Sequence, residues 1–160
     1  MSEHRLAFSI PLDDGGFLRR ECPHCEREFK WRPDEDDADP HDAVSMPEDG
    51  YACPYCAGRA PAHWWTAPQL EHAEQLAASE ILGPELKKLE RRADPRSMIS
   101  FEVKVDVPGA PAPIAEEPND RRRVVFACHP SEPVKVLEDW AGHVHCLICA
   151  TPAANRDQRI

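Results

Sequence analysis

The sequence predicts an α+β fold in which short β-hairpins, one long amphipathic helix and a proline-rich linker follow one another along the chain. Three observations support it: cysteine pairs stand between alternating apolar and polar residues, apolar residues recur every three to four positions after Thr66, and prolines crowd residues 108–118. A chain of 160 residues is long enough for one domain or two small ones. We expect an N-terminal domain over 1–95, a strand and linker over 96–120, and a C-terminal hairpin domain over 121–160.

The composition indicates a globular protein outside membranes. With 19 Lys and Arg against 29 Asp and Glu, the formal net charge is −10, which disfavours non-specific coating of nucleic acid or anionic membrane. No apolar run approaches the ~18 residues of a membrane span. The first 11 residues are too polar and too short for a signal peptide. We therefore expect a cytoplasmic protein without membrane contact.

Elements in the first part of the chain are centred on two cysteine pairs. Phe17 to Trp31 alternates in character and forms a hairpin with Cys22 and Cys25 at its tip. Residues 34–49 hold eight acidic residues and no Lys or Arg, which predicts a solvated acidic loop. A second C-x-x-C turn follows at 53–56.

A helix is predicted from residue 67 to residue 92. Thr66 and Gln69 have the spacing of a capping box, which marks the helix start. Gly83-Pro84 interrupts or kinks the helix, and Asp94-Pro95 ends it. One apolar stripe runs along the helix and comprises Leu70, Ala73, Leu76, Ala77 and Ile81.

In the last part of the chain, apolar and polar residues again alternate with a period of two, as in a strand. Residues 101–107 alternate as a half-buried strand, and the proline-rich linker follows at 108–118. Two further strands, 121–127 and 133–137, flank Cys128. The third C-x-x-C turn closes this hairpin.

The cysteines favour metal binding over disulfides. Their number is seven, whereas a disulfide framework uses an even number in a secreted chain. Cys22, Cys25, Cys53 and Cys56 supply four thiolates, the ligand set of a tetrahedral structural zinc site. The 27 residues between the two pairs make a long loop, which leaves the metal geometry unchanged.

Thiol redox chemistry is the main alternative for these pairs. Cys-Pro-His-Cys at 22–25 resembles the motif of periplasmic disulfide oxidases, and Cys-Pro-Tyr-Cys at 53–56 resembles that of glutaredoxins. Such motifs need a helix immediately after the first cysteine to lower its pKa. Residues 26–33 instead alternate like a strand, and Gly58 and Pro61 would break a helix. A thiol oxidoreductase is therefore disfavoured.

A second metal site is predicted with three cysteines. Cys128, Cys146 and Cys149 supply three thiolates, while Ser131 stands where a fourth cysteine is expected. The fourth ligand is then a histidine, a water molecule or nothing. A water ligand would allow a catalytic zinc, as in a hydrolase, but no general base is obviously placed beside it.

Three histidines are candidates for the fourth position. His143 and His145 have the parity opposite to Cys146, so an extended strand would point them away from the metal. His129 is adjacent to Cys128, and Pro130 bends the chain there. We favour His129 and keep the other two as alternatives.

The three C-x-x-C turns and their flanking hairpins resemble the broad zinc-ribbon class, over residues 17–60 and 121–152. That resemblance implies a scaffold held by two zinc ions and used for contacts with proteins or nucleic acids. The metal would also be needed energetically, because a core in pieces this small contributes only a few kcal/mol.

We therefore expect a non-enzymatic, zinc-scaffolded interaction protein with an adaptor or regulatory role. The 67–92 helix and Trp64 or Trp65 would contact another protein or a second copy of the chain. The alternative is a nucleic-acid-binding zinc ribbon with a basic hairpin; a zinc hydrolase or thiol oxidoreductase is less favoured. The basic hairpin comprises Arg19, Arg20, Arg27, Lys30 and Arg32.

Overall fold

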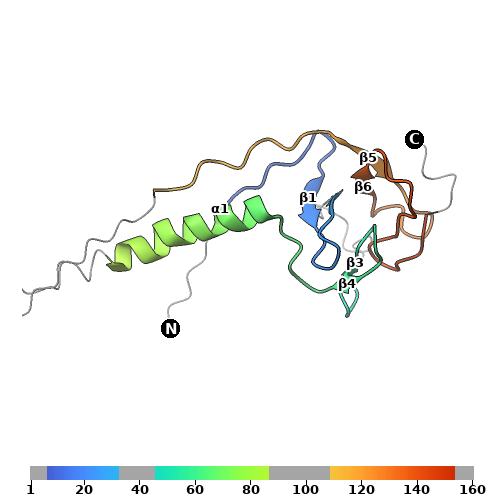
Figure 1. The fold of residues 1–160 in the computed structure, drawn as a ribbon, viewed down its shortest axis with the longest axis horizontal. Coiled ribbons are helices and arrows are strands. Elements are labelled where there is room, and N and C mark those ends of the chain that lie inside the picture. Colours follow the sequence, from blue (N-terminus) through green and yellow to red (C-terminus); the bar gives the residue numbers. More distant parts are fainter. Residues whose placement is uncertain (1–6, 33–45, 87–108, 154–160) are drawn as a thin grey trace, which may run out of the picture. The chain divides into compact units, whose positions relative to one another are not determined.

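The computed structural model describes residues 7–32, 46–86 and 109–153 (Figure 1). The chain divides into two compact units. The helix unit consists of Met1–Ile10 and Ala67–Ile114, and the sheet unit consists of Pro11–Thr66 and Ala115–Ile160. Small antiparallel sheets and one helix confirm the α+β class. The sheet unit joins two segments that the sequence analysis assigned to different domains.

The sheet unit is built on one four-stranded antiparallel sheet. Both predicted hairpins contribute to it, because β2 pairs with β6 through Lys30 opposite Lys135 and Trp31 opposite Val134. The cysteine pair at 22–25 lies between β1 and β2, and Cys128 lies between β5 and β6. The order across the sheet is β1 (Leu18–Glu21), β2 (Glu28–Trp31), β6 (Val134–Leu137) and β5 (Arg121–Val124).

One face of this sheet forms the apolar core. The register aligns Leu18, Trp31, Val134 and Val124 in one row across the four strands. Because side chains alternate between faces, Phe29 lies on this same side. Apart from the half-buried Trp31, these residues are buried. The core is completed by Val136, Phe126, Val144 and Leu147 together with Cys22, Cys53 and Cys146.

The opposite face carries a row of cations. Lys30 is 0% exposed and Lys135 is 6% exposed, although the two stand directly opposite each other. Asp13 lies between them, with its Oδ2 2.7 Å from Lys135 Nζ and 3.3 Å from Lys30 Nζ. Like charges opposite each other destabilise a sheet, and the Asp13 carboxylate offsets this repulsion by contacting both ammonium groups. Arg19 and Arg123 complete the row.

Residues 117–120 cover the same charged face. Glu117 Oε1 lies 3.0 Å from Lys30 Nζ, and Asp120 Oδ1 lies 3.2 Å from it. Lys30 also donates to the main-chain oxygen of Pro118, and Lys135 donates to Asn119 Oδ1 at 2.8 Å. These contacts fix the segment that precedes β5 against the sheet.

A second, two-stranded sheet carries the cysteine pair at 53–56. It consists of β3 (Tyr51–Ala52) and β4 (Arg59–Ala60). Tyr55, inside this turn, reaches the four-stranded sheet: its hydroxyl donates to Glu28 O at 2.9 Å and accepts from Leu137 N–H at 3.0 Å. Tyr55 therefore bridges β2 and β6 beyond their last paired residues.

Replacing Tyr55 by phenylalanine is expected to lower the free energy of unfolding by about 1–3 kcal/mol, because two main-chain groups lose their partner. The loss should appear in urea denaturation, and the amide of Leu137 should exchange faster with deuterium while the amide of Val134 keeps its rate. An unchanged Leu137 amide would show that the hydroxyl does not hold the strands together.

The helix unit contains α1 (Ala67–Ala77), continued by a π-helical turn, η1 (Ala78–Leu82), and by helical residues to Leu86. Helical conformation continues through Gly83, whose φ is −56° and whose N–H donates to Ala78 O. The wider π turn directly precedes Pro84, which has no N–H and whose ring crowds the preceding turn. The helix therefore passes Gly83 and Pro84 through a widened turn and continues to Leu86.

The apolar stripe of the helix is only partly covered within the described residues. Leu76 is buried, and the ring of Phe8 lies 5.4 Å from that of His72. Leu70 is 47% exposed and Leu82 is 57% exposed.

Several predicted elements lie outside the described residues: helix residues 87–92, the strand 101–107 and residues 34–45 of the acidic loop. Within the described ranges, no helix combines the length and the apolar character needed to cross a bilayer.

Candidate metal centres

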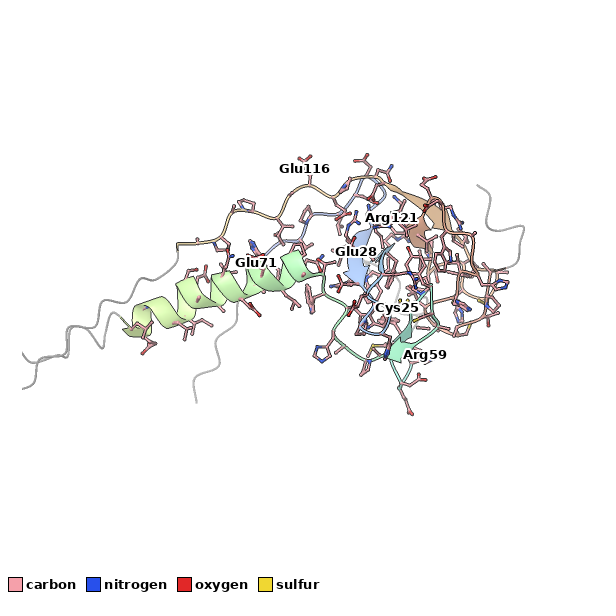
Figure 2. The ribbon with its side chains drawn as sticks, viewed as in Figure 1. Cys25, Glu28, Arg59, Glu71, Glu116 and Arg121 are labelled. Carbon is pink, nitrogen blue, oxygen red and sulfur yellow. The ribbon has the colours of Figure 1, made fainter. Side chains whose placement is uncertain are left out.

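The first candidate centre gathers four thiols from two hairpins. Cys22, Cys25, Cys53 and Cys56 place their sulfur atoms within 4.8 Å of one another. Sγ of Cys22 lies 3.8 Å from Sγ of Cys56, and the Cys25–Cys53 distance is also 3.8 Å. A tetrahedron with zinc–sulfur bonds of about 2.3 Å has edges of about 3.8 Å. The four thiols therefore fit zinc. Figure 2 labels Cys25, which lies in the turn between β1 and β2, and Arg59 of the β3–β4 hairpin.

All three C-x-x-C turns share one backbone conformation. In each, the first cysteine donates its N–H to the oxygen five residues on and accepts from the N–H four residues on. The residue directly after the second cysteine has a positive φ, which costs a residue with a side chain roughly 1–2 kcal/mol. The three residues are Glu26 at 56°, Ala57 at 58° and Ala150 at 58°.

Main-chain N–H groups point at the sulfur atoms inside these turns. His24 N–H donates to Cys22 Sγ at 3.4 Å, and Tyr55 N–H donates to Cys53 Sγ at 3.3 Å. Hydrogen bonds to a sulfur favour its thiolate form. These donors partly offset the cost of burying a thiolate, which burial itself disfavours at Cys22 and Cys53.

The second candidate centre gathers Cys128, His129, Cys146 and Cys149, again within 4.8 Å. His129 Nδ1 lies 3.4 Å from Cys146 Sγ, and Cys149 Sγ lies 3.4 Å from Cys128 Sγ. Tetrahedral zinc with one imidazole and three thiolates places nitrogen and sulfur about 3.6 Å apart and sulfur atoms about 3.8 Å apart. The group therefore also fits zinc, slightly contracted.

The structure brings His129 to the three thiols, and it places the other two histidines outside the cluster. The His145 N–H donates to Pro54 O at 2.9 Å, and His145 Nδ1 lies 3.2 Å from that oxygen. His143 is exposed. Around His129 the chain forms a different turn, closed by Glu132 N–H donating to His129 O at 3.1 Å. This turn lets consecutive residues, 128 and 129, face one centre.

Burial disfavours the thiolate form of several of these cysteines, so they need a cation to stay deprotonated. Burial raises the pKa of Cys146 to about 12 and also raises the pKa of Cys22 and of Cys53. Cys149 differs: burial opposes its ionisation, but hydrogen bonds with Thr151 lower the pKa of Cys149 to about 6. A divalent metal would hold the buried thiols deprotonated, so its binding releases protons.

The two centres share one scaffold. Ala52 N–H, beside the first centre, donates to Leu147 O at 2.7 Å inside the third C-x-x-C turn. Arg59, labelled in Figure 2, donates to Ile148 O at 2.8 Å in that same turn. The turn that carries Cys146 and Cys149 is therefore attached to the β3–β4 hairpin by hydrogen bonds that involve no ligand side chain.

Replacing His129 by alanine is expected to weaken zinc binding at the second centre, because only three thiols and water remain as ligands there, so that a chelator that spares the first centre lowers the zinc content from two ions to one. The matched control is His143→Ala, which removes a nearby imidazole that lies outside the cluster and should keep both ions. Native mass spectrometry of the two variants makes the comparison. Equal loss in both variants would contradict the assignment of His129.

The basic hairpin of the sequence analysis does not form one cationic surface. Lys30 is buried, and Arg19 pairs with Glu28 at 2.7 Å and with Glu117 at 2.6 Å. Arg20 is stacked between two indoles, with its guanidinium carbon 5.0 Å from the Trp31 ring and 4.5 Å from the Trp65 ring. Burial also lowers the pKa of Arg20 to about 10. Arg27, which lies 5.1 Å from the Trp140 ring, and Arg32 are exposed.

The two adjacent tryptophans have different environments. Trp64 is buried, its ring lies edge-on 5.8 Å from Phe29, and its Nε1–H donates to Ala60 O at 3.1 Å. Trp65 is 38% exposed. Only Trp65 therefore presents a surface that a partner could contact.

The sequence analysis missed the partners of the cations. In the sequence, Asp13 precedes Gly15 and Gly16, and Glu117 and Asp120 lie at the end of the proline-rich stretch, with no sign of these contacts. Glu28 pairs in the same way with Arg121, at 3.2 Å; both residues are labelled in Figure 2. Apart from Asp13 and Lys30, which are 17 residues apart, the members of these pairs are about 90 or more residues apart, so no local pattern marks them.

Comparisons of the chain with known protein families, with curated proteins and with solved structures give no match. The function of the two centres is therefore inferred from their residues alone.

Proposed function

We propose that this chain binds two zinc ions and uses the sheet unit that they hold as a non-enzymatic scaffold for contacts with another protein. The observation that carries the proposal is the pair of four-ligand groups, each with the size of a zinc tetrahedron. Four protein ligands fill such a tetrahedron, whereas a catalytic zinc keeps one position for water. This ligand count supports a structural use of the metal.

Exposed apolar side chains support the contact role. Leu70 and Leu82 are exposed on the helix unit, and Trp65 is exposed on the sheet unit. Large apolar and aromatic side chains of this kind anchor protein interfaces. A partner protein or a second copy of the chain would cover them.

The internal pairing of Arg19 and Lys30 argues against nucleic acid as the partner. Phosphate contacts require accessible cations and make binding fall steeply as salt rises. Titration of zinc-loaded protein with DNA and RNA at two salt concentrations separates the two functions. We expect no binding at either salt, and tight, salt-sensitive binding would favour the nucleic-acid function instead.

Sedimentation and capture experiments test the protein contact itself. We expect zinc-loaded protein to sediment as a dimer or to retain a defined partner, and Leu82→Glu to abolish that association because it places a charge on the exposed apolar position. The matched control is Glu74→Gln, an exposed polar change on the same helix, which should retain it. Association that survives Leu70→Glu, Leu82→Glu and Trp65→Glu alike would overturn the contact role.

A further inference from the structure

The second centre differs from the first in which sulfur atoms are accessible. Cys128 and Cys149 are both exposed, and their sulfur atoms are 3.4 Å apart. In the first centre, each close sulfur pair joins an accessible thiol to a buried one: Cys56 to Cys22 and Cys25 to Cys53. Among the described residues, the second centre is therefore the one whose close sulfur pair, 3.4 Å apart, belongs to two exposed cysteines.

We propose that the second centre is an oxidation site at which hydrogen peroxide joins Cys128 to Cys149 and releases the metal, while the first centre keeps its ion. This inference rests on the proposed binding of zinc. Reactive cysteines are those that combine thiolate character with solvent access. Zinc holds these sulfur atoms as thiolates, and their exposure supplies the access.

The reaction balances with peroxide as the only oxidant. One thiolate attacks a peroxide oxygen, the O–O bond breaks, and a sulfenic acid and one water form after a proton is taken from solvent. The second thiolate attacks the sulfenic sulfur, the S–S bond forms as the S–O bond breaks, and the departing hydroxide takes another proton from solvent to become a second water. Two electrons pass from the sulfur atoms to peroxide, and zinc departs as Zn²⁺.

The ligands that remain cannot retain the ion. After oxidation only Cys146 and His129 are left, and structural zinc uses four protein ligands. A disulfide between Cys128 and Cys149 should leave the four-stranded sheet and the first centre in place. The pairing of β2 with β6 and the hydrogen bonds of Tyr55 involve neither of these cysteines. Oxidation should therefore loosen the residues around the second centre without unfolding the sheet unit.

Peroxide treatment of the zinc-loaded full chain tests this inference. We expect a chromophoric chelator to detect release of one of the two ions, native mass spectrometry to show the chain with one zinc, and peptide mapping to find a Cys128–Cys149 disulfide. A reductant with added zinc should restore the second ion. Alkylation of Cys22 and Cys53 should stay blocked throughout.

The matched variant is Cys149→Asp, which keeps an oxygen ligand for zinc and removes one of the two sulfur atoms. It should retain its second ion under peroxide or, if the carboxylate binds too weakly, yield no Cys128 disulfide within the chain. Release of both ions together, release from the first centre, or a disulfide that involves Cys22 or Cys53 would overturn the inference. A chain that binds no zinc before peroxide is added would instead overturn the proposed function.

Discussion

Replacing Cys53 by serine is expected to unfold the sheet unit. Its sulfur is buried in the core and is one of the four ligands of the first centre. Structural zinc contributes about 10–16 kcal/mol in small zinc-binding domains, more than the total stability of most domains of this size. Loss of near-UV circular dichroism and of amide protection in β1, β2 and β6 would report the unfolding.

The matched control for Cys53→Ser is His24→Ala. His24 lies inside a C-x-x-C turn but contributes no ligand; its Nε2 lies 2.8 Å from Arg59 O at an exposed position. The control should keep two zinc ions and lose no more than about 1 kcal/mol. A folded, fully protected Cys53→Ser protein would show that the metal does not hold the core.

Replacing Asp13 by alanine is expected to lower the free energy of unfolding by about 3–5 kcal/mol, because Lys30 and Lys135 remain buried without the carboxylate between them. Both lysines touch Asp13 Oδ2, and the Asp13 side chain is wholly buried. Urea denaturation of zinc-loaded protein measures the difference. The matched control is Asp14→Ala, an exposed neighbour whose removal should cost less than about 0.5 kcal/mol.

The same carboxylate predicts a pH dependence. Burial opposes ionisation of Asp13, but hydrogen bonds from Lys135 and from the N–H groups of Phe17 and Gly15 lower the pKa of Asp13 below its usual value. Because the folded pKa is depressed, this stability is present above the unfolded pKa of about 3.9 and is lost as pH falls through the folded value. Asp13→Asn should flatten that acid limb; an unchanged limb would contradict the role of Asp13.

A second variant distinguishes charge pairing from packing at this position. Changing Asp13, Lys30 and Lys135 together to leucine or methionine removes the buried charges and retains the volume. Such replacement is often neutral or stabilising. We therefore expect the triple variant to be more stable than Asp13→Ala, and an equally unstable triple variant would indicate that packing is the dominant contribution.

Local features of this fold were predictable from the sequence, because local spacing encodes them. Two residues between cysteines specify the turn that all three pairs adopt, and the change of period after Thr66 marks the helix. The gathering of the thiols was also accessible, since the ligand requirements of zinc link distant turns. His129 was favoured among three histidines on the parity of its competitors, and the structure brings it to the cluster.

Non-local pairing was not predictable. Lys30 alternates with Phe29 and Trp31, so its pattern indicates a solvated position, yet β6 and residues 117–120 bury it. Arg20 lies on the apolar face of the four-stranded sheet because its guanidinium stacks on the indole rings of Trp31 and Trp65. The pairing of β2 with β6 joins segments about 100 residues apart, and no short-range pattern records that partnership.

The zinc content of the chain, measured by native mass spectrometry in reducing buffer and followed by chelation, tests the central claim most directly. We predict two zinc ions per chain and collapse of near-UV circular dichroism when a strong chelator removes them. A chain without zinc whose C-x-x-C pairs are oxidised to disulfides, or one that keeps its fold after complete metal removal, would contradict the claim that two zinc ions hold this scaffold together.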